Sequence, residues 1–264
     1  MSFFSVERLT AGYDKAPVLR ELSFDLPQGS LMGVLGANGS GKTTLLKAIC
    51  GIVPHTGQCL LEGKPLEGLR AKDIARLVSY IPQRSGITID ISALDVVLMG
   101  FNPRLGLLER PSPAMIQQAQ RALETVGLSS QGEKNYLHLS EGQKQLCILA
   151  RTLVSGSRLL LLDEPESALD FHHRFEMLAL LRRRVEQENI SAIVTLHDPA
   201  LALNYCHRLL LVEPGRVAGV LEPERDSLPA MEEKLGRLYG AVSLQRCQTS
   251  GGKSWLVMLK EEQE

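Results

Sequence analysis

Hydrophobic and polar residues alternate in the first part of the chain in a way that predicts antiparallel strands. Residues 2 to 30 and 57 to 66 have a period of two, and turn residues such as Glu62-Gly63-Lys64 interrupt the runs. A period of two buries one face of a strand and leaves the other face in solvent. Between these segments, the uninterrupted apolar run Leu31 to Leu35 predicts a buried strand that leads into an amphipathic helix.

From about Ile91 to Ser155 the spacing of the hydrophobic residues becomes helical. Ser92 followed by Asp95 has the pattern of a capping box, which marks the start of a helix. Ser112-Pro113 opens another helix, and Gly127 can close it. We therefore expect a mostly helical segment in the middle of the chain.

After Arg158 strands and helices alternate. The pattern predicts a strand, a helix, a second strand and a short helix opened by Asp198-Pro199, with the first three at Leu159 to Leu162, about Phe171 to Gln187, and Ala192 to Thr195. Such alternation is typical of βαβ units, and it predicts an α/β fold with a mostly parallel sheet. Four apolar residues of the longer helix recur at helical spacing and are expected to pack in the core: Phe175, Leu178, Leu181 and Val185.

Composition narrows the classes of function. At 264 residues the chain can bury one substantial core, with room for a modest second subdomain. The formal net charge of -1 leaves no basic excess to neutralise a nucleic-acid backbone. No apolar run approaches the roughly 18 residues of a membrane span, and residues 1 to 7 lack the regions of a signal peptide. We therefore expect a cytoplasmic protein that is at most peripheral to a membrane and has no nucleic-acid partner.

The cysteines do not form a recognisable framework. They are odd in number, widely spaced and mostly embedded in apolar segments: Cys50, Cys59, Cys147, Cys206 and Cys247. We expect buried free thiols in a reducing compartment, in preference to a metal site or a set of disulfides.

The most informative motif is the segment Gly36 to Thr44, which lies between the predicted buried strand and the helix after it. It matches every fixed position of Gly-x-x-x-x-Gly-Lys-Ser/Thr. Glycines let the backbone turn tightly and aim its N–H groups at phosphate oxygens, and the positive end of the helix dipole adds to the attraction. The motif predicts a phosphate-binding loop in which Lys42 holds the β- and γ-phosphates and the Thr43 hydroxyl ligates Mg²⁺.

A second motif is the apolar run Leu159 to Leu162 followed by Asp163 and Glu164. In open α/β sheets, ligands bind outside the carboxyl ends of the strands, so both acids are expected to face the phosphate loop. Consecutive residues that leave a strand point in different directions. Asp163 can therefore hold Mg²⁺ while Glu164 addresses the water that attacks the γ-phosphate, which favours hydrolysis over transfer to a bound substrate. The alternative is a solvated acidic turn.

His197 lies just past the next predicted strand and so reaches the same edge of the sheet. An imidazole there can hydrogen-bond the γ-phosphate and orient the attacking water. A lone histidine at a strand end more often makes a structural hydrogen bond, but the shared edge favours a functional role. His172 and His173 stand at a helix start and are assigned no role.

A third motif, Leu139-Ser140-Glu141-Gly142-Gln143, leads into an apolar helix. Ser140 with Gln143 three residues later has the pattern of a capping box, and Gly142 leaves the backbone exposed. Such a helix end can bind an anion. Taken alone, the motif indicates an ordinary helix cap.

Together these residues resemble the ATPase subunits of ABC transporters. That family has, in order, a phosphate loop, a glutamine after the next core strand, a Leu-Ser-Gly-Gly-Gln motif, an Asp-Glu strand end, an Asp-ended loop and a switch histidine. This chain has the whole set in order, with the glutamine at Gln83 and the Asp-ended loop at Ser167-Ala168-Leu169-Asp170. Tyr13 matches the aromatic residue that stacks on adenine. The resemblance spans about residues 3 to 240.

The resemblance implies a site for ATP and Mg²⁺ and a role for each matching residue. Glu164, His197 and Gln83 would be catalytic, and Thr43, Gln83 and Asp163 would hold Mg²⁺. The residues expected to bind ATP are Tyr13, Gly36, Asn38, Gly39, Ser40, Gly41, Lys42, Thr43, Thr44, Ser140, Gly142, Gln143 and Asp170. Two departures stand out: Glu141 replaces a glycine of the usual motif, and Glu166 replaces a more usual Thr or Ser.

The family fold sets the expected organisation of the chain. It predicts an α/β P-loop NTPase core with a mostly parallel sheet, an N-terminal antiparallel β subdomain and an inserted helical subdomain. In one ABC ATPase domain over 1–264, the core would cover residues 1–84 and 156–240, and the helical subdomain 85–155. Residues 241–264 hold two strand-like runs around Thr249-Ser250-Gly251-Gly252, which predict a hairpin without assigned chemistry.

In the family, two ATPase subunits bind head to tail, so Ser140 and Gly142 of one chain would complete the site on the phosphate loop of the other. The resemblance therefore implies a homodimer at the cytoplasmic face of the membrane, a permease dimer as partner, and indirectly an extracytoplasmic substrate-binding protein. Binding of ATP would close the dimer and hydrolysis would reopen it.

Within the family, the importers of iron siderophores, haem and cobalamin look most similar. The similarity rests on Asp95 to Gly100, Pro103 to Gly106 and Leu238-Tyr239-Gly240, although Phe101-Asn102 replaces a more usual basic-aromatic pair. The alternatives are another ABC transporter or a soluble ABC-type ATPase of iron–sulfur cluster assembly. A DNA-repair ATPase would need a long coiled-coil insertion, and a translation factor of this type would carry two cassettes, so neither fits this chain.

Overall fold

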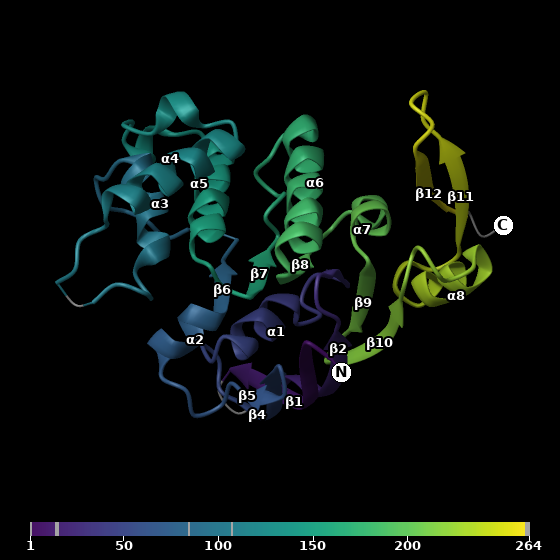
Figure 1. Ribbon diagram of the computed structural model, residues 1–264. Helices are drawn as coiled ribbons and strands as arrows, with labels where there is room; N and C mark the ends of the chain where they lie inside the picture. Colours follow the sequence, from purple (N-terminus) through teal and green to yellow (C-terminus); the bar gives the residue numbers. More distant parts are fainter. Residues whose placement is uncertain (1, 14–15, 84, 107, 262–264) are drawn as a thin grey trace. The chain divides into compact units, whose positions relative to one another are not determined.

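The computed structural model describes residues 2–13, 16–83, 85–106 and 108–261, and the chain divides into two compact units (Figure 1). The first unit contains Met1–Gly68 and Leu178–Glu264, and the second contains Leu69–Met177. The long helix α6 (Phe171–Glu188) begins in the second unit and ends in the first.

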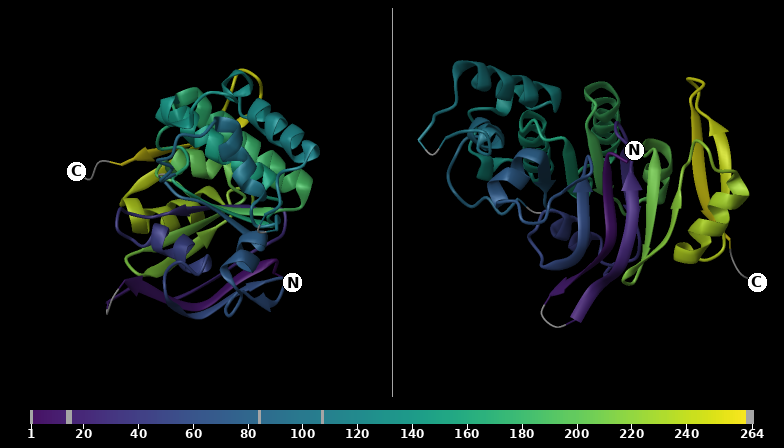
Figure 2. Two further views of the ribbon diagram at one scale, coloured as in Figure 1. Left: turned by 90° about the vertical axis from the view of Figure 1, so that its left-hand side faces the viewer. Right: turned by 60° about the horizontal axis from the view of Figure 1, so that its bottom comes forward.

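The first unit contains the predicted antiparallel sheet. Its strands follow the order β2-β1-β4-β5, with bounds Ala16–Leu26, Phe4–Tyr13, His55–Leu61 and Lys64–Pro65. Figure 2 shows the two long N-terminal strands, in purple, lying side by side. Phe4 and Val6 of β1 are buried while Glu7 is exposed, so the alternation in the sequence reflects a sheet with one face on the core.

The first unit also contains a second sheet with parallel strands at its centre. β3 (Leu31–Leu35) pairs in parallel with both β8 (Ser191–Thr195) and β9 (Arg208–Glu213). β10 (Arg216–Leu221) adds antiparallel to β9. Every residue of β3 and β8 is buried, which explains their uninterrupted apolar sequences.

The remaining elements of the first unit include a helix after β3 and a C-terminal hairpin. The helices are α1 (Lys42–Ile49), α7 (Pro199–Tyr205) and α8 (Leu228–Tyr239). The hairpin strands β11 (Val242–Gln248) and β12 (Ser254–Lys260) pair antiparallel, as the two strand-like runs predict. Asn204 of α7 holds the hairpin, because its side-chain amide donates to the Leu256 carbonyl and accepts from the Leu256 N–H, each at 2.8 Å.

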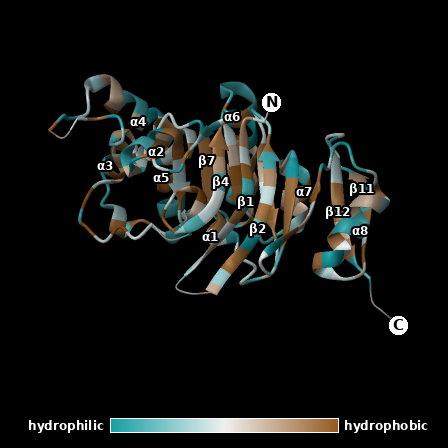
Figure 3. Ribbon diagram, turned by 90° about the horizontal axis from the view of Figure 1, so that it is seen from below, coloured by the Kyte–Doolittle hydropathy of each residue, from teal (hydrophilic) through white to brown (hydrophobic). Residues whose placement is uncertain are grey.

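The second unit is mostly helical, with a pair of parallel strands. β6 (Val78–Ile81) pairs in parallel with β7 (Leu159–Asp163). The helices are α2 (Ala71–Leu77), α3 (Ala93–Leu98), α4 (Pro113–Thr125) and α5 (Glu141–Val154), with short 3₁₀ turns η1 (Met99–Phe101), η2 (Ser129–Gln131) and η3 (Tyr136–His138). All five residues of β7 are buried, and its leucines colour the strand hydrophobic in Figure 3.

Short-range capping fixes where the helices of the second unit begin. The predicted capping boxes are present at Ser92 with Asp95 and at Ser140 with Gln143. Ser112 caps α4, whose first residue is Pro113. Each cap satisfies backbone N–H groups that have no partner within the helix, and removing one typically costs about 1 kcal/mol.

The cysteines are all free, and their burial follows the prediction with one exception. Cys59, Cys147 and Cys206 are buried and Cys50 is half-buried. Cys247 is exposed, because the end of β11 turns its side chains to solvent, so the expectation of burial was wrong for this residue. Within the described residues, no helix combines the length and hydropathy needed to cross a membrane.

Candidate functional site

The phosphate loop lies between β3 and α1 in the first unit, and its glycines are required by geometry at two positions. A Cβ atom on Gly36 would lie 2.3 Å from the Val212 carbonyl oxygen. Gly41, the residue before α1, has a φ of 105°, a left-handed conformation that L side chains rarely adopt. These constraints shape a tight loop that ends at the amino terminus of a helix, where N–H groups and the helix dipole attract anions.

The side chains of the loop suit a polyanion. The Lys42 ammonium is buried and donates to the carbonyls of Gly36 at 2.8 Å and Ala37 at 3.2 Å, so it lies across the loop itself. The Ser40 hydroxyl is also buried and has no hydrogen-bond partner among the residues that the structure describes. A buried cation and an unpaired hydroxyl beside a helix amino terminus fit the phosphates of a nucleotide.

His197 reaches the same edge of the sheet as the phosphate loop. Val34 of β3 is paired with Thr195 of β8, and the N–H of Leu196 donates to the Val34 carbonyl at 3.2 Å. Gly36 comes two residues after Val34, and His197 comes two residues after Thr195, so both lie at the same edge of the sheet. His197 therefore lies at the edge where the sequence predicts it, and it is exposed there. Tyr13, the last residue of β1, is 49% exposed.

In the second unit, Asp163 and Glu164 at the end of β7 have different partners. The buried Asp163 carboxylate accepts from the Tyr80 hydroxyl at 3.3 Å. The Glu164 carboxylate accepts from the side-chain amide of Gln83 at 2.6 Å. Since β6 and β7 are parallel neighbours, the residues that follow both strands meet at one edge. The amide of Gln83 therefore orients the acid that the sequence assigns to catalysis.

Glu164 also has an uncommon backbone conformation. Its φ is 48°, in the left-handed region that few residues other than glycine adopt. A strained residue directly after a buried strand is a feature that clusters at functional sites, because the surrounding structure must enforce it.

The Ser140 motif forms the predicted helix start and lies beside the Asp-ended loop. The Ser140 hydroxyl accepts from the Gln143 N–H at 3.2 Å, and the Gln143 side chain accepts from the Ser140 N–H at 3.0 Å. A Cβ atom on Gly142 would lie 3.1 Å from the Ala168 carbonyl oxygen. Glu141, which departs from the family pattern, points outward and pairs with Lys144 at 2.8 Å. The acidic residue is thus neutralised within its own helix.

Asp170 directly precedes α6 and contacts His173, a residue to which the sequence analysis assigned no role. The Asp170 carboxylate accepts from the His173 N–H at 3.0 Å and lies 2.8 Å from the His173 ring nitrogen Nδ1. The hydrogen bond from the backbone N–H, followed by that from the ring, lowers the pKa of Asp170. An aspartate three residues before a histidine at a helix start is a capping pattern, which was the available signal for this contact.

The predicted site residues thus fall into two groups, one in each unit. Tyr13, the phosphate loop and His197 belong to the first unit. The second unit contains the remaining members of the set: Gln83, Ser140, Gly142, Gln143, Asp163, Glu164 and Asp170.

Comparison with known proteins supports this assignment. The sequence model of the family described as ABC transporter matches residues 19–167, which is more than half of the chain. This chain belongs to the ABC transporter family. The resemblance predicted from the motifs is therefore confirmed.

Two relatives of this ABC protein are ATP-binding proteins of import or transport systems. The hemin import ATP-binding protein of Bordetella bronchiseptica is 36% identical over 242 residues, which cover 88% of this chain and 90% of the relative. The manganese transport system ATP-binding protein of Bacillus subtilis is 35% identical over 216 residues, 81% of this chain and 84% of the relative.

A solved structure extends the match to the whole fold. An inward-facing, putative metal-chelate type ABC transporter aligns with a TM-score of 0.81 and 28% identity, covering 99% of both chains. The predicted fold class, an ABC ATPase fold with an antiparallel β part, is therefore confirmed. The structural match includes the C-terminal hairpin region, which the family model does not cover.

Proposed function

We propose that this chain is the ATP-hydrolysing subunit of an ABC importer that takes up a metal chelate: an iron–siderophore, haem or cobalamin. The assignment of ATP hydrolysis rests on one contact. Glu164, which directly follows the buried Asp163, accepts a hydrogen bond from the Gln83 side chain at 2.6 Å. The cargo part is supported by relatives named for hemin and siderophore transport, and by the metal-chelate type of the similar structure.

Glu164 is suited to act as a general base. The amide of Gln83 fixes the direction of the Glu164 carboxylate, and a carboxylate in a fixed position can accept a proton from the attacking water. His197, at the edge of the sheet that carries the phosphate loop, would hydrogen-bond the γ-phosphate. Both roles follow the family pattern and position the attacking water for hydrolysis.

The phosphate loop would hold the nucleotide. Its backbone N–H groups and Lys42 would neutralise the phosphates, and Tyr13 would stack on the adenine. Thr43 and Asp163, with Gln83, supply oxygen ligands of the kind that Mg²⁺ prefers. When bound, Mg²⁺ would supply charge neutralisation at the β- and γ-phosphates.

The functional unit would be a head-to-tail homodimer. Ser140 and Gly142 begin α5 with exposed or half-buried backbone, and one copy would present this helix end to the γ-phosphate held by its partner. Residues 85–155 would contact the permease at the cytoplasmic face of the membrane, with an extracytoplasmic binding protein delivering the cargo.

The test is ATP turnover in liposomes that contain the cognate permease. A binding protein loaded with a siderophore, haem or cobalamin should raise turnover, whereas binding proteins for amino acids, sugars or free phosphate should not. Stimulation by a non-chelate cargo alone, or copurification with an exporter, would overturn the cargo assignment and leave the ATPase assignment intact.

The manganese relative favours a second candidate, an importer of a bare divalent metal ion. The same liposomes distinguish the two, because a manganese-loaded binding protein would then stimulate turnover and the chelate-loaded proteins would not.

A further inference from the structure

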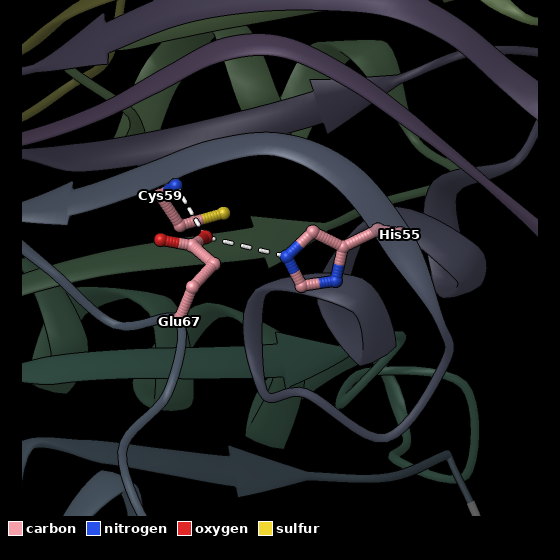
Figure 4. A group of neighbouring side chains, drawn as sticks. All are labelled: His55, Cys59 and Glu67. Carbon is pink, nitrogen blue, oxygen red and sulfur yellow. Dashed lines mark hydrogen bonds and ion pairs between the residues drawn. The ribbon is translucent and has the colours of Figure 1, made fainter.

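Three potential metal ligands converge within the first unit. His55 and Cys59 lie on β4, and Glu67 follows β5. Their ligand atoms, a ring nitrogen, a thiol sulfur and a carboxylate oxygen, all lie within 4.8 Å of one another. Figure 4 shows the three side chains pointing toward one another, with the Glu67 carboxylate between the cysteine and the histidine.

The cluster is held in place by the backbone. The Glu67 oxygen Oε1 accepts from the Cys59 N–H at 2.7 Å, which fixes the carboxylate beside the strand. Cys59 is fully buried, and the His55 side chain is only 12% exposed. The Glu67 side chain is 31% exposed, so the cluster is reachable from solvent on one side only. Such a setting fixes the positions of the ligand atoms.

Both ring nitrogens of His55 lie near oxygen atoms. Nδ1 lies 3.3 Å from the Val53 carbonyl oxygen, an acceptor, so Nδ1 must carry a proton to make this contact favourable. Nε2 lies 3.3 Å from Glu67 Oε1. If the ring is neutral with its proton on Nδ1, Nε2 presents a lone pair to a carboxylate.

The geometry and the donor types agree on the class of metal. Bonds of about 2.0–2.3 Å to nitrogen, oxygen and sulfur in a tetrahedron separate ligand atoms by roughly 3.4–3.6 Å. The nitrogen and oxygen are already 3.3 Å apart, so closure around an ion requires mainly a small shift of the sulfur relative to them. Imidazole, thiolate and carboxylate together select borderline ions such as Zn²⁺ or Co²⁺ over the hard ion Mg²⁺.

We propose that His55, Cys59 and Glu67 form a binding site for one divalent transition-metal ion of the Zn²⁺ type, separate from the nucleotide site. The carbonyl that orients His55 belongs to Val53, and the N–H of Ile52 next to it donates to the Lys47 carbonyl at the end of α1 at 2.9 Å. A bound ion therefore joins β4 and the loop after β5 to the carboxyl end of the phosphate-loop helix. This site rests on its own contacts and is independent of the transported cargo.

The test uses the full chain without an affinity tag, titrated with Co²⁺ and free of nucleotide. One Co²⁺ per chain should give a near-ultraviolet thiolate-to-metal absorption band, and added Zn²⁺ should displace it while millimolar Mg²⁺ should not. Cys59→Ser should abolish the band. His55→Gln should weaken Zn²⁺ binding by more than the roughly 10–100-fold that loss of a supporting contact costs.

Matched variants locate the ion. Cys247→Ser removes an exposed thiol, and His172→Gln removes an exposed imidazole, so both should leave the band and the Zn²⁺ affinity unchanged. Thermal unfolding of each metal-free variant verifies that it folds. A parent chain without the band, or a band lost with Cys247→Ser and kept with Cys59→Ser, would overturn the proposal. Failure of ATP hydrolysis in any variant would bear on the proposed function and not on this site.

Discussion

Glu164 illustrates how one contact assigns a chemical role to a side chain. Two adjacent acids end β7, and their partners differ: Asp163 accepts from a tyrosine hydroxyl, whereas Glu164 accepts from the amide of Gln83. In the proposed mechanism the buried acid would hold a metal ion, and the acid held by an amide would act on a water molecule. A change confined to the second carboxylate should therefore affect hydrolysis and spare nucleotide binding.

Glu164→Gln tests this role with an almost isosteric change. Hydrolysis should slow by at least the roughly 10²-fold typical of losing a general base, while the affinity for Mg-ATP stays nearly unchanged. Phosphate release and fluorescent-nucleotide titration measure the two quantities. Glu124→Gln, the same change on the exposed face of α4, serves as the control. Hydrolysis by Glu164→Gln at the parent rate would contradict the assignment of Glu164 as the general base.

Cys147 predicts a dependence of stability on pH. Burial raises the pKa of this thiol to about 12, whereas a thiol in the unfolded chain titrates near 8.5. Above about pH 8.5 the Cys147 thiol therefore loses its proton in the unfolded chain but keeps it in the folded chain. The contribution of this thiol to the free energy of unfolding is fully present below about pH 8.5 and falls as the pH rises. At pH 10 the loss from this group should be on the order of 1–2 kcal/mol.

Urea unfolding at pH 7 and pH 10 in a reducing buffer measures that loss. Cys147→Ala is less stable at both values because it leaves a cavity, but it should lose less stability between them than the parent chain does. Cys247→Ser, at an exposed position, should follow the parent. Equal losses in the parent and in Cys147→Ala would show that the thiol does not titrate differently in the two states.

In the second unit, one capping box lies at the helix end that we propose to act on a partner subunit. α5 begins with Ser140 and Gln143, whose side chains satisfy each other's N–H groups. α4 begins with Ser112, which accepts from the Met115 N–H. Both serines stabilise their helices, so the loss of a cap alone cannot distinguish them. Only α5 has a half-buried glycine packed against the loop that precedes Asp170.

Ser140→Arg and Ser112→Arg therefore form a matched pair. Each loses a cap worth about 1 kcal/mol, so the two should show similar small decreases in thermal stability. In a Glu164→Gln background, ATP should drive dimerisation of Ser112→Arg, whereas Ser140→Arg should bind nucleotide and stay monomeric. Light scattering with and without ATP distinguishes these states. A normal ATP-driven dimer of Ser140→Arg would mean that this helix end does not act on a partner subunit.

The chain as a whole is proposed to carry complementary halves of two ATP sites. If the Ser140 motif of one copy completes the site of another, then a lone copy binds ATP without hydrolysing it efficiently. The free chain should then show a specific ATPase activity that rises with protein concentration until the dimer is saturated. Activity per chain measured over a hundredfold dilution series tests this, and a constant value in a protein that sediments as a monomer would contradict it.

Local sequence was sufficient for features whose causes lie within a few residues. The glycines and Lys42 of the phosphate loop, and the boxes at Ser92 and Ser140, depend on backbone conformation and on N–H groups close in the chain. The buried strands β3 and β7 were evident from uninterrupted apolar runs. The family order of the motifs then predicted their roles, because that order is more specific than any one of them.

Contacts between distant residues depended on the tertiary structure. Gln83 and Glu164 are 81 residues apart, and only the pairing of β6 with β7 brings them within hydrogen-bond distance. The strands β9 and β10 were not predicted, since their pairing partners decide their conformation as much as their own residues do. His55, Cys59 and Glu67 have no metal-binding spacing in the sequence, and they converge because a strand and the loop after a short hairpin return to the same place. Strand pairing and packing decide such contacts, because they bring residues together in space whatever their separation along the chain.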